Sequence, residues 1–244
     1  MYRKFSVLFL LGLLSQAVMA APQTFSSGPN RVATVELYTS EGCSSCPPAE
    51  QYLTSLRKSP GLWKDFIPMA FHVDYWDYLG WRDRFSSALF SQRQRQYARL
   101  LRMNTVYTPG FFVDGREWRR GLLRGKPAFR HENVGRLNIY VQNQQLTGEF
   151  EPTIPGSRKL RVNVALLGMG LQSKINSGER GGTSTTHDFV VLGYTQQPLP
   201  DSSFSVALPK PSVAAKEKGI VVWVSQDTDP TPLQAVGGLL KPSE

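Results

Sequence analysis

Cysteine and histidine are scarce in this chain, which has two cysteines and three histidines among its 244 residues. A structural zinc site needs about four ligands. His72, His131 and His187 lie far apart in the sequence and form no paired spacing. The sequence therefore argues against a zinc site, and we expect no cofactor.

Long hydrophobic runs are also missing after residue 20. Before it, Arg3 and Lys4 precede an apolar stretch over 5–14, and small residues near Ala20 fit cleavage by signal peptidase. This stretch is too short for a comfortable membrane span, so we predict a signal peptide over 1–20, with an uncleaved anchor as the alternative. Export would leave a periplasmic or secreted protein with no membrane span and with both cysteines in an oxidising compartment.

No compact basic run accompanies the formal net charge of +9. The excess is mostly arginine, spread over the segment from Arg82 to Arg136. Nucleic-acid binding is typical of clustered basic patches, and an exported protein meets little nucleic acid. We therefore expect no nucleic-acid partner and interpret the charge as a solvated face that can meet an anionic envelope surface.

Both cysteines lie in one short stretch, Glu41-Gly42-Cys43-Ser44-Ser45-Cys46-Pro47-Pro48. An apolar run typical of a strand precedes it over 32–38, and apolar residues at helical spacing follow it from Ala49 to Leu56. This order predicts that the cysteines lie at a helix N-terminus, where unpaired N–H groups and the helix dipole favour a thiolate. The two prolines suit the first helical turn. An inert structural disulfide is the alternative, but it would close only a four-residue ring and remove little chain entropy.

From residue 31 to about 145, strand-like and helix-like patterns alternate. We predict a strand over 67–73, a helix over 83–103 with an apolar stripe through Phe85, Leu89 and Tyr97, and a strand over 106–113. Asp114-Gly115 predicts a hairpin turn. A final helix is predicted over 132–144, with its inward face at Val134, Leu137, Tyr140 and Val141. Together these elements indicate an α/β sheet covered by helices.

This order of elements looks like the thioredoxin fold, and the chain is similar to an exported bacterial family catalogued as domain of unknown function 1223. The resemblance covers nearly the whole mature chain. It is carried by 35–50, by His72-Val73-Asp74-Tyr75-Trp76-Asp77, and by Tyr107-Thr108-Pro109 with Val113-Asp114-Gly115. It implies a fold and a site but no settled reaction. It also implies that Cys43 is an exposed attacking thiol, that Cys46 resolves the mixed disulfide, and that Pro109, preceded by Thr108, is a cis-proline facing them.

The site departs from ordinary thioredoxins at two places. Ser44-Ser45 stands between the cysteines, and Glu41-Gly42 replaces the usual preceding tryptophan. Serine hydroxyls can stabilise a thiolate and Glu41 opposes it by charge repulsion, so the motif does not determine the redox potential. Glu36 has two interpretations: a buried carboxylate that shuttles a proton to the resolving thiol, or an ordinary polar position in a strand.

The pattern of residues changes after residue 150. Apolar and polar residues alternate from Leu160, and turn signals separate short strand patterns. We predict a thioredoxin-like domain over 31–150 and a small all-β, sandwich-like domain over 151–244. The polar segment 176–183 resembles a loop of the same family and has two interpretations, a binding loop or a plain connection between strands.

Three classes of function follow. The first is a thiol–disulfide oxidoreductase that acts on protein thiols or disulfides through Cys43 and Cys46. The second is a copper(I)-handling module, because thiolates suit soft metals. The third is a binding protein in which the cysteines form a structural disulfide. The helix-terminal position of the pair favours the first.

Overall fold

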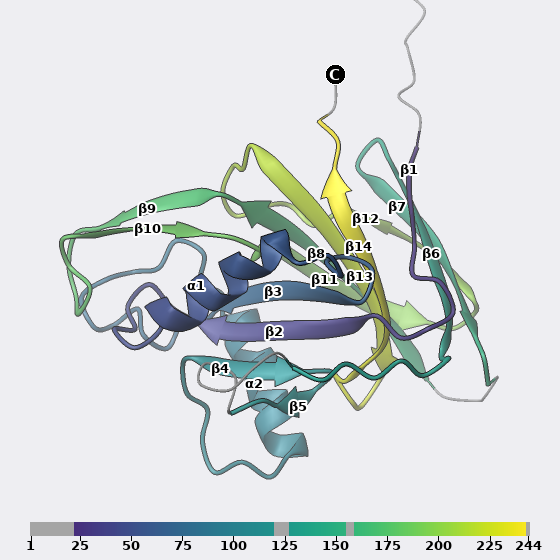
Figure 1. Cartoon of the computed structure of the whole chain (residues 1–244), viewed down its shortest axis with the longest axis horizontal. Coiled ribbons are helices and arrows are strands. Elements are labelled where there is room, and N and C mark those ends of the chain that lie inside the picture. Colours follow the sequence, from purple (N-terminus) through teal and green to yellow (C-terminus); the bar gives the residue numbers. More distant parts are fainter. Residues whose placement is uncertain (1–21, 120–126, 155–158, 243–244) are drawn as a thin grey trace, which may run out of the picture.

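The computed structural model describes residues 22–119, 127–154 and 159–242, so the predicted signal peptide at 1–20 lies outside the described residues. Strands predominate within these ranges, and the two α-helices are α1 (Pro47–Ser55) and α2 (Ala88–Leu100). The protein is therefore mixed α/β, as predicted, but with much more strand than helix (Figure 1). Neither helix is long and apolar enough to cross a membrane, a statement that covers the described ranges alone.

An eight-stranded mixed sheet forms the centre of the molecule, in the order β14-β13-β8-β11-β3-β2-β4-β5. Its strands are β2 (Ala33–Thr39), β3 (Phe66–His72), β4 (Gly110–Val113), β5 (Arg116–Glu117), β8 (Leu160–Met169), β11 (Val190–Leu199), β13 (Glu217–Gln226) and β14 (Pro232–Leu240). β2 and β3 are parallel, and every residue of both is buried. Parallel strands covered on both faces need near-continuous apolar runs, which explains their composition.

The two helices cover opposite faces of β2. Successive side chains of a strand point to opposite faces, so the contacts of β2 show which helix lies on which face. Glu36 and Tyr38 point to one face, where their partners are Arg93 and Tyr97 of α2. Thr39 points to the other face and donates its hydroxyl to Glu50 of α1. α1 therefore carries the cysteine stretch on the face of the sheet opposite α2 (Figure 1).

The central sheet takes strands from both sides of residue 150. β11 pairs with β3 in parallel at Val190 and Ala70, and β8, β13 and β14 continue from β11 by antiparallel pairing. The sheet itself therefore does not divide at the predicted domain boundary.

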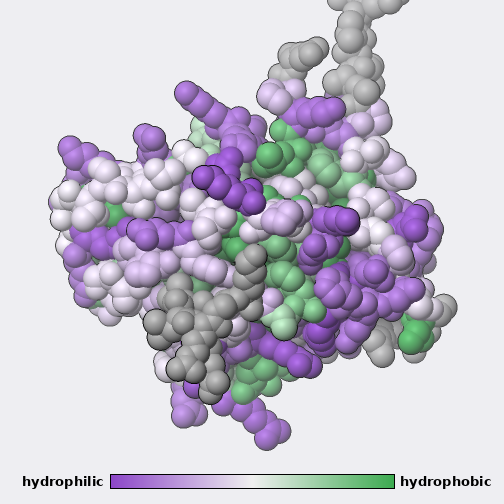
Figure 2. All heavy atoms as spheres, viewed as in Figure 1, coloured by the Kyte–Doolittle hydropathy of each residue, from purple (hydrophilic) through white to green (hydrophobic). Residues whose placement is uncertain are grey.

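A second, four-stranded antiparallel sheet packs on the far part of the central sheet, in the order β1-β6-β7-β12. Its strands are β1 (Gln23–Ser26), β6 (Gly135–Gln142), β7 (Gln145–Pro152) and β12 (Ser203–Ala207). Leu137 and Ile139 share an apolar core with Val162 and Val222 of the central sheet. The outer positions of β6 and β7 are exposed or half-buried, and Figure 2 shows many hydrophilic residues on the right-hand side, where these strands lie.

The helix predicted over 132–144 is wrong, because this segment forms β6 and the turn into β7. Leu137, Ile139 and Val141 are buried at every second position, whereas Tyr140 is 47% exposed. Asn143 and Gln144 have positive φ angles and close a two-residue hairpin. A short run of apolar residues fits both periods, and the partner sheet decides between them.

Helix α2 is shorter than predicted and buries a more polar face. It begins after Ser87, whose hydroxyl accepts a hydrogen bond from the N–H of Leu89. Leu89 is exposed rather than inward, whereas Arg93 and Gln94 are buried. The predicted apolar stripe is therefore wrong at Leu89. The helix turns Arg93 and Gln94 inward because Arg93 pairs with the buried Glu36, and this orientation leaves Leu89 in solvent.

A buried ion pair joins α2 to β2. Arg93 Nε lies 2.9 Å from Glu36 Oε2, and its Nη2 lies 2.7 Å from Oε1. The hydroxyls of Tyr97 and Tyr38 donate to the same carboxylate at 2.7 and 2.9 Å. Four hydrogen bonds therefore offset the desolvation of the Glu36 carboxylate, and the Arg93 guanidinium also lies over the rings of aromatic neighbours.

Replacing Arg93 with leucine should destabilise the protein strongly, because Glu36 would keep its buried position without a counter-charge. Breaking a buried ion pair in this way costs about 3–5 kcal/mol. Urea unfolding followed by circular dichroism measures the loss. The matched control is Arg95→Leu, an exposed position of the same helix, which should change stability by less than about 0.5 kcal/mol. Equal effects of the two substitutions would contradict the prediction.

Candidate functional site

Cys43 and Cys46 form a disulfide, with their Cα atoms 5.5 Å apart. The pair lies in the turn between the parallel strand β2 and helix α1, as the sequence predicts. The N–H of Cys43 donates to Ser40 O and that of Cys46 to Cys43 O, so two successive tight turns bring the sulfur atoms together.

The N-cap of α1 is Cys46, and Cys43 lies three residues earlier in the turn. Pro47 and Pro48 occupy the first two helical positions and have no N–H groups. The N–H of Ala49 already donates to Cys46 O. The first turn of α1 therefore offers fewer free donors to a thiolate than a proline-free helix would, and the expected stabilisation by this helix end is reduced.

The expectation that Cys43 is an exposed thiol is wrong for the disulfide form, because both cysteines are 0% exposed. Ser44 and Ser45, which lie between them, are exposed instead. The Ser45 hydroxyl lies 3.4 Å from Cys43 Sγ. The turn therefore presents its serines to solvent and its sulfur atoms to the interior.

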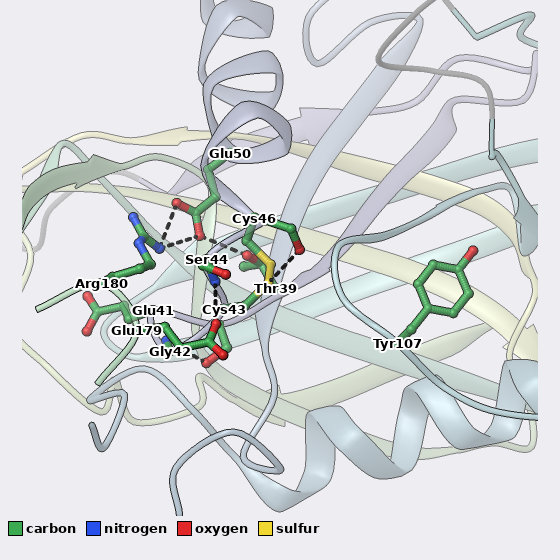
Figure 3. Close-up of a disulfide and its surroundings, with 12 residues drawn as sticks. Thr39, Glu41, Gly42, Cys43, Ser44, Cys46, Glu50, Tyr107, Glu179 and Arg180 are labelled. Atoms are coloured by element: carbon green, nitrogen blue, oxygen red, sulfur yellow. Dashed lines mark hydrogen bonds and ion pairs between the residues drawn. A yellow bond between two sulfur atoms is a disulfide. The ribbon is translucent and has the colours of Figure 1, made fainter. Parts of the chain in front are cut away.

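The Thr108–Pro109 peptide bond is cis, which confirms that part of the prediction. Gln94 of α2 holds this loop, since its side-chain amide donates to Tyr107 O at 2.7 Å. Figure 3 shows Tyr107 set apart from the disulfide, on the opposite side from Glu179 and Arg180. The predicted packing of Pro109 against the cysteines stays a prediction.

Glu36, the candidate proton shuttle, lies on β2 but on the face directed to α2. The helix that begins after Cys46 covers the other face. Donors from Arg93, Tyr97 and Tyr38 occupy both carboxylate oxygens. Glu36 is therefore a buried ion-pair partner of α2, and its carboxylate is directed away from α1. Other acidic side chains lie beside the cysteine turn.

Glu41 and Glu50 supply these acidic groups, and both are buried. Glu41, two residues before Cys43, accepts from Trp81 Nε1 at 2.8 Å and lies 3.2 Å from His187 Nε2. The other ring nitrogen of His187 lies 3.9 Å from Glu50 Oε2. Burial by itself raises the pKa of Glu41, but the bonds from His187 and Trp81 outweigh it and leave the pKa below its ordinary value.

The hairpin of β9 (Leu171–Ile175) and β10 (Thr183–His187) brings a loop over 176–182 to the cysteine turn. Within this loop, Arg180 Nη1 lies 3.4 Å from Glu50 Oε2, and both side chains are buried. Glu179 Oε2 accepts from the N–H of Ser44 at 3.3 Å. Figure 3 shows Arg180 and Glu179 approaching the turn from one side, with Glu50 reaching down from α1.

His72 and Asp83 form a second buried pair behind the turn. His72 Nδ1 lies 2.6 Å from Asp83 Oδ2, which also accepts the N–H of Glu41 at 2.8 Å. Burial alone would lower the pKa of His72, but Asp83 outweighs it and raises the pKa. Burial likewise opposes ionisation of Asp83, and His72 overcomes it, so the pKa of Asp83 is lowered. His72 is thus a core histidine whose partner is an acid.

Sequence reasoning missed most of this network. Asp83 and His187 lie 42 and 146 residues from Glu41, and Arg180 lies 130 residues from Glu50. The available signal was the polar loop over 176–183, which we considered as a binding loop without assigning it a partner. Three buried acidic side chains, Glu41, Glu50 and Asp83, thus lie beside one arginine and two histidines.

The fold and the site define a class of protein: a mixed α/β chain with a Cys-X-X-Cys disulfide between a buried parallel strand and a helix. The chain belongs to the family described as protein of unknown function DUF1223, whose model matches residues 34–225. A comparison with curated proteins finds no match.

Two solved structures resemble this chain. One is the X-ray structure of protein AGR_C_4864 from Agrobacterium tumefaciens, 26% identical, with a TM-score of 0.61 over 86% of this chain and 94% of that one. The other is HBP35 of Porphyromonas gingivalis, 12% identical, with a TM-score of 0.55 over 86% of this chain and 75% of that one. At that identity, the likeness to HBP35 concerns the fold alone.

The His72–Asp83 pair should make stability depend on pH. Its contribution is complete above the ordinary aspartate pKa of 3.8 and below the ordinary histidine pKa of 6.5. It is lost as pH rises through the raised pKa of His72, and as pH falls through the lowered pKa of Asp83. The stability difference between wild type and His72→Gln should therefore be largest in that window. Chemical unfolding across pH measures it.

The control for this prediction is His131→Gln, which removes an exposed histidine. Its stability relative to wild type should stay flat across the same pH range. A pH-independent penalty for His72→Gln would mean that packing of the ring, rather than its charge, stabilises the site.

Proposed function

We propose that this protein is an exported, thioredoxin-like thiol–disulfide oxidoreductase that acts on protein cysteines through Cys43 and Cys46. The observation that carries the proposal is the Cys-X-X-Cys disulfide in the turn between β2 and α1. The buried acidic groups and His187 around the turn support it.

The proposed reaction moves two electrons between two pairs of sulfur atoms. A thiolate of the partner protein attacks Cys43 Sγ, the Cys43–Cys46 bond breaks, and Cys46 leaves as a thiolate that takes up a proton. The partner's second thiolate then attacks the mixed disulfide and releases Cys43. The partner dithiol becomes a disulfide, and its two protons end on Cys43 and Cys46. Running the same steps backwards reduces a partner disulfide.

The acidic groups beside the turn give this exchange a proton requirement. A thiolate next to Glu41 and Glu50 would add negative charge to a region that already holds two buried carboxylates. Proton uptake removes this penalty, and His187 lies between the two carboxylates at 3.2 and 3.9 Å. We therefore assign the electrostatic influence on the thiols to Glu41 and Glu50 in preference to Glu36, whose carboxylate faces α2.

Replacing Cys46 with serine should trap mixed disulfides between Cys43 and partner proteins, because the resolving thiol is lost. Non-reducing gels of the exported variant, compared with Ser45→Ala as a control for the turn, show whether adducts form. A protein with Cys43→Ser and Cys46→Ser together should lose about 2 kcal/mol or less, because the ring is short. A large fall in melting temperature with no adduct would favour the structural disulfide instead.

Access to the buried sulfur atoms should depend on the loop over 176–182. Glu179→Ala removes the acceptor of the Ser44 N–H and a negative charge that repels an approaching thiolate. Loss of one such hydrogen bond should speed reduction by dithiothreitol about two- to tenfold. Stopped-flow fluorescence or quenched alkylation measures the rate.

The matched control is Asp201→Ala, which removes the same charge from an exposed position in another connection. It should leave the rate of reduction unchanged. If both substitutions, or neither, change the rate, the loop does not control access to the disulfide.

No specific observation favours the copper(I) alternative. Across the described ranges, 22–119, 127–154 and 159–242, no group of three or more histidine, cysteine or acidic side chains is arranged to hold a metal ion.

A further inference from the structure

A polar pocket of about 580 Å³ lies away from the cysteine turn, between α2 and the strands β8, β11 and β13. This volume is within the range of about 300–1,000 Å³ that is usual for small-molecule sites. Among its lining residues only Leu100 and Pro230 carry apolar side chains. The others offer guanidinium, amide, hydroxyl and carboxylate groups.

The floor of the pocket exists because one face of these strands is polar. Val162 and Val164 of β8 point to the apolar core between the two sheets, so Arg161 and Asn163 point the other way, toward α2. Ser225 pairs with Arg161 across the neighbouring strand β13. A polar strand face that is not sealed by a helix leaves hydrogen-bonding groups available to a ligand.

The floor residues are held in place by internal hydrogen bonds. Asn163 donates to the Ser225 hydroxyl at 3.1 Å and accepts from the Tyr194 hydroxyl at 2.7 Å. Arg93 is fixed by its ion pair with Glu36. A ligand would therefore meet a prearranged surface, which lowers the entropy cost of binding.

The rim carries one unbalanced positive charge. Arg93 is neutralised by Glu36, and Arg161 pairs with Asp227 at 2.8 Å. Arg99, on the exposed side of α2, has no ion-pair partner within residues 22–119, 127–154 and 159–242. Arg161 is partly exposed, so its guanidinium can be reached from the pocket even though it pairs with Asp227.

The geometry points to a binding site for a small polyhydroxylated anion, a sugar acid or a sugar phosphate. Its carboxylate or phosphate would lie near Arg99 and Arg161, because guanidinium groups bind both anions with paired hydrogen bonds. Its hydroxyls would meet the amides of Gln96, Gln196 and Gln226. This inference does not depend on the redox proposal.

Isothermal titration of the oxidised full chain with four probes tests the site: glucuronate, glucose 1-phosphate, glucose and inorganic phosphate. At least one of the two sugar anions should bind saturably at millimolar concentration, more tightly than glucose and inorganic phosphate. The comparison of glucuronate with glucose 1-phosphate distinguishes a carboxylate from a phosphate ligand. Binding should weaken as salt is added, because the charge is partly exposed.

Arg99→Gln should weaken that binding at least about fivefold, the loss expected for one charge-assisted contact at an open site. Arg95→Gln is the matched control, because it removes the same charge from an exposed position of the same helix outside the pocket. It should change affinity by less than about twofold. Both positions are exposed, so neither substitution should disturb folding.

Three results would overturn the inference. The first is the absence of saturable binding by either sugar anion. The second is binding of glucose or inorganic phosphate as tight as that of the better sugar anion. The third is an equal loss in the Arg99→Gln and Arg95→Gln variants.

Discussion

Burial of charge on both faces of β2 is the constraint on which the rest of this structure depends. Glu36 needs donors on one face, and Glu50, bonded to Thr39, needs a counter-charge on the other. An unpaired carboxylate in either place would cost several kcal/mol. The position of α2 is therefore tied to Arg93, and the hairpin loop over 176–182 is tied to Arg180.

This arrangement gives the cysteine turn an unusual electrostatic setting. The helix end that would favour a thiolate has prolines in its first two positions, while Glu41 and Glu50 lie close by and are buried. Both effects favour neutral thiols or the disulfide over a thiolate. In the exchange that we propose, these buried acidic groups would oppose the thiolate form of either cysteine.

Local patterns predicted the region around the cysteines well. The continuous apolar run identifies the strand β2, and the two prolines after Cys46 identify the start of α1. The segment 132–144 was mispredicted because Leu137 and Val141 suit a helical face as well as a strand. The inward face of α2 was mispredicted because its partner is the Glu36 carboxylate, which no periodicity in α2 reveals.

The sequence alone determined the family, the strand–turn–helix around Cys43 and Cys46, and the strand-rich character of the C-terminal part, because these depend on residues close together in the chain. The tertiary structure decided that the disulfide is buried, that β11 joins β3 in one sheet, and that Arg180 meets Glu50. Such features depend on pairings across more than 100 residues, and a buried charge selects its partner only when the whole core has excluded water.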